Sequence, residues 1–105
     1  MASLANKISI IREVIAGYAK SSLTGEPSYL TQSDDGKLIT VVDVYTSDGK
    51  THADTGLVVR IEGEYIVIDH DMNNKPLVDA LVQAGIPREQ IILAYAGEPV
   101  PETAA

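Results

Sequence analysis

Two carboxylates that face one another across a hairpin are the residues of this chain best placed to do chemistry. Asp48-Gly49 is a dipeptide favoured in two-residue hairpin turns, because both positions tolerate a positive φ. A turn at this point sets Asp43 opposite Asp54. Directly opposed like charges destabilise a strand pair. We therefore expect compensation by solvent, by Arg60, by a basic patch on a partner or by a cation.

A second turn, at Gly63-Glu64, extends this register to the next strand. It sets Asp71 opposite Gly56, and likewise Asp69 opposite Val58. Because side chains alternate strictly along a strand, these acidic residues share a face with those of the first hairpin. The candidate partner-binding residues on this predicted acidic face are Asp43, Tyr45, His52, Asp54, Tyr65, Asp69 and Asp71.

The opposite face of the predicted strands is the core face. Val42 and Val44 belong to it, together with alternate apolar residues of 57–61 and 66–68. His70 also falls on this face, as a partly buried structural histidine. On the acidic face, Val67 is an apolar neighbour that could anchor a partner beside Tyr65.

Several kinds of site fit the predicted acidic face. A solvated charged surface is the plainest interpretation, and a partner-binding surface is the next. A metal site is less favoured, because no Ca²⁺-loop spacing is present. Asp43 and Asp54 could serve a hydrolytic enzyme if their environments split their pKa values, but no Ser-His-Asp arrangement or phosphate-cradling loop is legible. We therefore expect no enzyme, no catalytic residue, no metal and no cofactor.

The charge balance argues against nucleic acid as a direct partner. The 105 residues include 15 acidic and eight basic ones, a formal net charge of −7. Proteins bind nucleic acid largely through Lys and Arg that neutralise phosphates, whereas here no two basic residues are adjacent. The presence of five Tyr with no Trp or Phe also argues against a base-stacking platform. A protein partner with a basic surface fits better.

The chain contains no Cys, so disulfides and thiolate chemistry are excluded. No apolar run reaches the ~18 residues of a membrane-spanning helix, and the first residues lack the pattern of a signal peptide. We expect a cytoplasmic protein without membrane contact. Its length predicts a single domain over residues 1–105, with a folded core over 1–96 and a loose tail over 97–105.

The hydrophobic periods predict an α+β fold. Helical spacing occurs over residues 4–18 and 77–82, and strand patterns occur over 29–33, 38–46, 51–62, 65–70 and 91–93. The short connections make the first four strands an antiparallel meander. An open sheet with both helices on one face would bury both apolar stripes. Asn73 or Asn74 caps the second helix, and Gly85 ends it in a left-handed conformation.

The second half of the chain resembles the XisI-like family, small cyanobacterial proteins known as excision controlling factors of the fdxN element. The likeness rests on the hairpin LVVRIEGEYIVIDHD and on the segment LVDALVQAGIPREQIIL, over residues 57–93. The departures are the absence of tryptophan, with Val67 where one is common, and Met72-Asn73-Asn74 after Asp71. The resemblance identifies the chain as a divergent member.

This resemblance implies an α+β fold and a non-enzymatic, accessory or regulatory role. The family is often encoded beside a partner of the XisH type, which looks like a nuclease-fold protein. We therefore expect a binding module that docks a protein partner. The alternative is a structural or small-ligand domain that forms a homodimer, with an edge strand pairing across a two-fold axis.

Overall fold

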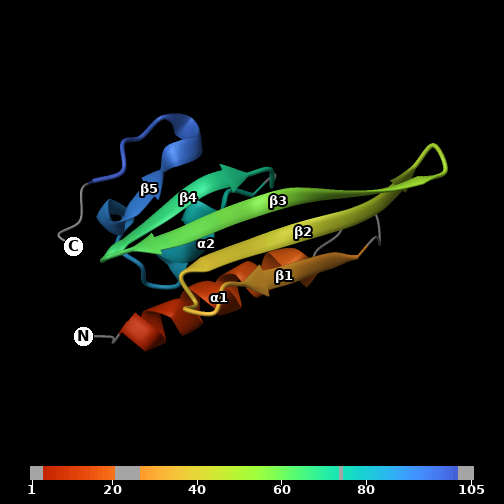
Figure 1. The fold of residues 1–105 in the computed structure, drawn as a ribbon. Helices are drawn as coiled ribbons and strands as arrows, with labels where there is room; N and C mark the ends of the chain where they lie inside the picture. The colour runs from red at the N-terminus through yellow and green to blue at the C-terminus, as the bar shows by residue number, and fades with distance from the viewer. Residues whose placement is uncertain (1–3, 21–26, 74, 102–105) are drawn as a thin grey trace.

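The computed structural model describes residues 4–20, 27–73 and 75–101, which form an α+β fold (Figure 1). The elements, in order, are α1 (Leu4–Lys20), β1 (Ser28–Gln32), β2 (Leu38–Ser47), β3 (Lys50–Glu62), β4 (Tyr65–Asp71), α2 (Leu77–Gln83), the 3₁₀ turn η1 (Arg88–Gln90), β5 (Ile91–Leu93) and the 3₁₀ turn η2 (Ala94–Ala96). The predicted α+β class is confirmed, with two α-helices and five strands among the described residues. Residues 21–26 and the end of the predicted tail, 102–105, lie outside the described residues.

Within the described chain, the strands form one sheet in the order β1-β2-β3-β4-β5. The first four strands are antiparallel, joined by short turns, as predicted. β5 is parallel to β4, which requires a crossover, and α2 lies in that connection. No helix among the described residues is long and apolar enough to cross a membrane.

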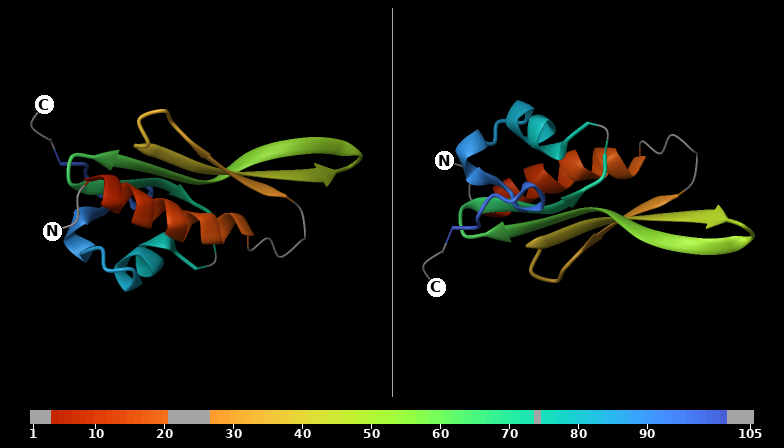
Figure 2. Two further views of the ribbon diagram at one scale, coloured as in Figure 1. Left: turned by 90° about the horizontal axis from the view of Figure 1, so that it is seen from below. Right: turned by 90° about the horizontal axis from the view of Figure 1, so that it is seen from above.

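The hydrophobic core lies between the sheet and the helices. Figure 2 shows α1 and α2 on the same face of the sheet. Each helix contributes fully buried aliphatic side chains, Ile11 and Ile15 from α1, and Leu77 and Leu81 from α2. The sheet side of this core consists of Ile39, Val41, Leu57, Val59, Ile61, Ile66, Ile68 and Ile91. Burial of such a continuous apolar layer is the main term that stabilises the fold.

The core face of β2 is the opposite of the one expected. Ile39 and Val41 are buried, whereas Val42 and Val44, predicted to face the core, are only half-buried. The cause is a β-bulge: the pairing changes from Val42 with Thr55 to Val41 with Leu57. Gly56 is an extra residue on β3 between these two pairs. Because of it, the side chains of β2 that share a face with Leu57 and Val59 are Val41 and Ile39, and no longer Val42 and Val44.

A second bulge shifts the pairing of β3 with β4. Leu57 lies opposite Asp71, and Val58 lies opposite His70, so the predicted pairs of Gly56 with Asp71 and of Val58 with Asp69 are wrong. Asp71 is therefore in line with Leu57, on the helix-covered face. His70 is half-buried as expected, but it is in line with Val58, on the face away from the helices.

Val67 does not anchor a surface, because its side chain is completely buried. It lies between the core residues Ile66 and Ile68 and so faces away from α1 and α2. β4 contacts η2, and Glu98 fixes the segment after η2. The Glu98 carboxylate accepts a hydrogen bond from the backbone N–H of Leu93 at 2.7 Å.

A lysine on α1 connects distant parts of the chain. The Lys7 ammonium group donates to the Glu64 carbonyl oxygen at 2.6 Å and to the Gln90 side-chain oxygen at 2.8 Å. Burial lowers the pKa of Lys7, and the charge of Glu64 acts in the opposite direction. The start of α1 is thereby fixed to the β3–β4 turn and to η1.

The end of α2 offers a direct test of the packing. Leu81→Ala should lower the free energy of unfolding by about 2–5 kcal/mol, through lost burial and the cavity that remains. The neighbouring Val82 is 42% exposed, so Val82→Ala should change it by only about 0.5 kcal/mol. Urea unfolding of both variants measures the difference, and equal effects would contradict the packing. The left-handed conformation expected at Gly85 is confirmed, with a φ of +100°.

Candidate functional site

The β2–β3 hairpin extends well beyond the rest of the sheet (Figure 1). The ladder with β1 ends at Asp43, opposite Ser28, and the ladder with β4 ends at Leu57. We call residues 44–55 the arm. It gives the molecule a length of 48 Å against widths of 26 and 25 Å. Every residue from 46 to 55 is exposed.

Local sequence explains why the arm is a hairpin. Asp48 and Gly49 have φ values of +54° and +75°, as a two-residue turn of the I′ type requires. This turn fixes the predicted register, which is confirmed near the arm's base: Asp43 lies opposite Asp54, and Tyr45 lies opposite His52. The β-branched residues that flank the turn favour the extended conformation.

Aromatic and acidic side chains of the arm form one small cluster. The rings of Tyr45 and His52 are stacked, with centroids 5.2 Å apart and an interplanar angle of 21°. The Tyr45 hydroxyl donates a hydrogen bond to the Asp54 carboxylate at 2.5 Å. A stacked pair that also donates to a carboxylate gives the exposed ribbon a defined side-chain surface.

The carboxylate of Asp43, at the base of the arm, is stabilised by a residue of β1. The Ser28 hydroxyl on β1 donates to Asp43 at 2.6 Å. A Cβ on Gly56 would lie 2.5 Å from the Asp43 carboxylate, so a larger residue there would displace this carboxylate from its present position. The opposed carboxylates of Asp43 and Asp54 are thus each compensated in part by a hydroxyl donor, an outcome that the sequence analysis did not include.

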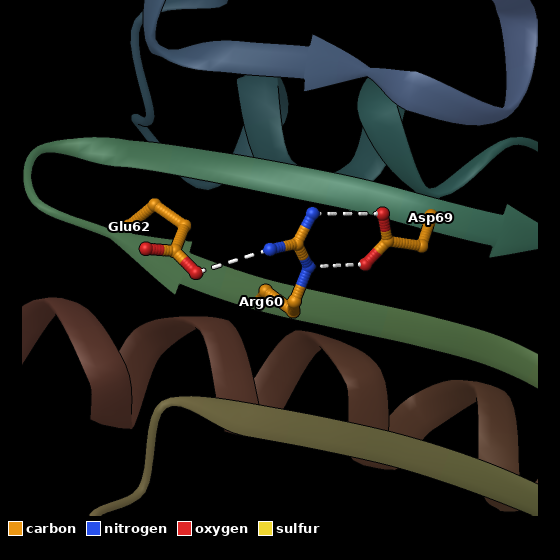
Figure 3. Close-up of polar contacts among 3 residues, drawn as sticks. All are labelled: Arg60, Glu62 and Asp69. Atoms are coloured by element: carbon orange, nitrogen blue, oxygen red, sulfur yellow. Dashed lines mark hydrogen bonds and ion pairs between the residues drawn. The ribbon is translucent and has the colours of Figure 1, made fainter. Parts of the chain in front are cut away.

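Arg60 neutralises another candidate residue, Asp69. Its guanidinium group donates to both carboxylate oxygens of Asp69, at 2.5 and 3.1 Å, and to Glu62 at 3.1 Å (Figure 3). The hydrogen bond with Asp69 is the main cause that raises the pKa of Arg60. This bidentate geometry is strong for an ion pair, so Asp69 is engaged within the fold and lies apart from the arm.

Asp71 has a structural position at the start of α2. Its carboxylate accepts a hydrogen bond from the backbone N–H of Leu77 at 2.8 Å, and from the backbone and side chain of Asn73 at 3.0 and 2.7 Å. Asn73 therefore does not cap the helix as predicted, and Asn74 lies outside the described residues. Burial, followed by the charges of Asp71 and Asp79, raises the pKa of Tyr18.

The seven candidate residues therefore do not form one continuous acidic face. Asp43, Tyr45, His52 and Asp54 gather on the arm and at its base, Asp69 pairs with Arg60, Asp71 lies toward the helices, and Tyr65 is half-buried in the β3–β4 hairpin. Within residues 4–20, 27–73 and 75–101, no group of three or more His, Asp or Glu side chains is arranged to hold a metal ion.

Two residues that shape the site were not among the predicted ones. Ser28 is brought to Asp43 only by the β1–β2 pairing, and a single polar residue at a strand start carries no signal for that. Gly56 was detectable, because a glycine inside a strand often marks a bulge or the close approach of another group.

Comparison with known proteins gives a consistent result. The sequence model of the family described as XisI protein matches residues 1–103. The crystal structure of the fdxN element excision controlling factor XisI from Anabaena variabilis superposes with a TM-score of 0.72 at 24% identity, and covers 88% of this chain and 91% of that one. A XisI-like protein from the same organism superposes with a TM-score of 0.76 at 16% identity, with coverages of 87% and 85%. No curated protein matches the sequence.

The position of Asp71 predicts that its carboxylate serves stability. Asp71→Ala should lower the free energy of unfolding by about 0.5–2 kcal/mol, the usual loss when a side chain no longer accepts from the first helical N–H groups. Asp34, in the exposed β1–β2 turn, supplies the control Asp34→Ala. Urea unfolding measures both. An Asp71→Ala protein as stable as the control would contradict a capping role.

Proposed function

The chain belongs to the XisI protein family, and on this basis we propose that it is a non-enzymatic accessory protein, similar to an excision controlling factor, that binds a protein partner through its arm. The arm is the single observation that carries this proposal. Ten consecutive exposed residues, 46–55, project from the sheet on a ribbon of only two strands. An isolated two-stranded ribbon is marginally stable in water. A partner protein that covers the arm would therefore stabilise it.

The charge of the arm and of the whole chain indicates that the partner's surface is basic. The net charge is −7, and the arm cluster carries the opposed carboxylates of Asp43 and Asp54. A basic patch on the partner would complement it, accelerate encounter and select against acidic competitors. The stacked rings of Tyr45 and His52 supply an aromatic anchor of the type that dominates binding energy in protein interfaces.

The partner that the family resemblance implies is a nuclease-fold protein of the XisH type. A protein that handles nucleic acid commonly carries a basic surface, and this chain offers the complementary sign. The proposed contact is restricted to the arm cluster. Asp69 and Asp71 are left out of it, because Arg60 and the start of α2 already occupy their carboxylates.

A charge reversal within the arm tests the proposal. Asp54→Lys should weaken capture of the neighbouring gene product about tenfold, equivalent to about 1.4 kcal/mol, by placing a cation against a basic surface. Asp34→Lys makes the same change of charge in the β1–β2 turn, at the other end of β2 from the arm, and should leave capture nearly unchanged. Titration calorimetry with purified partner measures both affinities.

The pair of variants separates a local contact from a general charge effect. If both reversals weaken binding equally, net charge alone is responsible and the arm has no special part. If a folded Asp54→Lys protein binds like the unmodified chain, the arm is not the interface. Circular dichroism of each variant establishes that the fold is retained.

A further inference from the structure

One edge of the arm has backbone groups that nothing in the described chain pairs with. β4 leaves β3 at Leu57, and the backbone N–H of Met72 donates to the Gly56 carbonyl oxygen as its last contact there. From Lys50 to Thr55, β3 is paired with β2 on one side only. An unpaired strand edge is a template for the addition of another strand.

The hydrogen-bond pattern shows which groups point outward. The backbone N–H of Val44 donates to the Pro27 carbonyl oxygen at 3.0 Å, on the side of β2 away from β3. Val44 and its opposite residue, Ala53, therefore form a non-hydrogen-bonded pair of the β2–β3 ladder. The N–H and C=O groups of Ala53 must point to the open edge, and by alternation so do those of Thr51 and Thr55.

The sequence of this edge is complementary to itself. Reading from its centre, Ala53 is flanked by His52 and Asp54, and these by Thr51 and Thr55. We propose that two copies of this chain form a homodimer by pairing these edges antiparallel about a two-fold axis at Ala53. All three outward-pointing residues then exchange backbone hydrogen bonds with the second copy, as an isologous interface requires.

The side chains favour this register over its neighbours. Each His52 lies opposite Asp54 of the second copy in a close, non-hydrogen-bonded pair, and each Thr51 lies opposite Thr55, both favourable cross-strand combinations. The nearest alternative registers differ by two residues, because only such a step keeps the outward-pointing residues of the two copies opposite one another. One alternative sets His52 against His52 and the other sets Asp54 against Asp54, so each places two like groups at the axis.

The pairing gives Asp54 a favourable neighbour. Asp54 faces Asp43 within its own hairpin and gains an imidazole on its other side from the second copy. The paired segment is limited to residues 51–55, because Met72 of the same chain already lies opposite Gly56 and donates its backbone N–H to the Gly56 carbonyl oxygen. Lys50 and the turn of each arm therefore end beside the other copy's Met72, which is 72% exposed.

A proline at the axis tests the dimer. Ala53→Pro removes an outward N–H without removing any bond to β2, because edge positions of this kind tolerate proline. Thr46→Pro is the matched control: Thr46, opposite Thr51, lies in the next non-hydrogen-bonded pair of the same arm, and its N–H points away from β3 on the other edge. Sedimentation equilibrium of the full chain should show a concentration-dependent dimer for the unmodified and Thr46→Pro proteins, and a monomer for Ala53→Pro.

Cysteine crosslinking tests the register. The chain has no Cys, and residues that face each other in a hydrogen-bonded antiparallel pair have Cα atoms about 5.5 Å apart, within the range a disulfide spans. Ala53→Cys should therefore form a disulfide-linked dimer under mild oxidation, and Thr46→Cys should not. A monomeric unmodified chain, a dimer that survives Ala53→Pro, or equal crosslinking of both cysteine variants would each overturn the proposal.

Discussion

The extra residue at Gly56 in β3 is the constraint on which the arrangement of the sheet depends. It shifts the β2–β3 pairing by one, so that Ile39 and Val41 meet the helices while the arm keeps the register set by its own turn. The absence of a side chain at Gly56 also leaves the space that the Asp43 carboxylate occupies. Core and arm are therefore two halves of one hairpin, joined at the position where their registers differ.

This junction divides one hairpin into a buried part and an exposed part. On the body side, β3 lies between β2 and β4 and one of its faces is covered by α1 and α2 (Figure 2), so Leu57, Val59 and Ile61 are buried. On the arm side, the flanking strands have ended and the side chains are exposed. Family membership and the superposed crystal structures establish the fold, whereas function has to be argued from the surface of this particular chain.

The sequence predicted what depends on neighbouring residues and missed what depends on distant ones. The register at Asp43 and Asp54 follows from the Asp48-Gly49 turn a few residues away, and it was correct. The pairing of Asp71 was wrong because a bulge at Val58 and Val59 shifts the β3–β4 register beyond the part that the Gly63-Glu64 turn determines. Val67 was misassigned because the alternating strand pattern places it on the surface, whereas it is completely buried and its strand, β4, contacts η2, a segment almost thirty residues later in the chain.

The central claim is that the outward-pointing backbone groups of the arm are a pairing surface. Residue-resolved hydrogen exchange by NMR over a series of protein concentrations measures this most directly. Because Thr51, Ala53 and Thr55 point to the open edge while His52 and Asp54 bond to β2, an alternating pattern is expected. Protection of Thr51, Ala53 and Thr55 should rise with concentration toward that of His52 and Asp54. Fast exchange of these three amides at every concentration would contradict the claim.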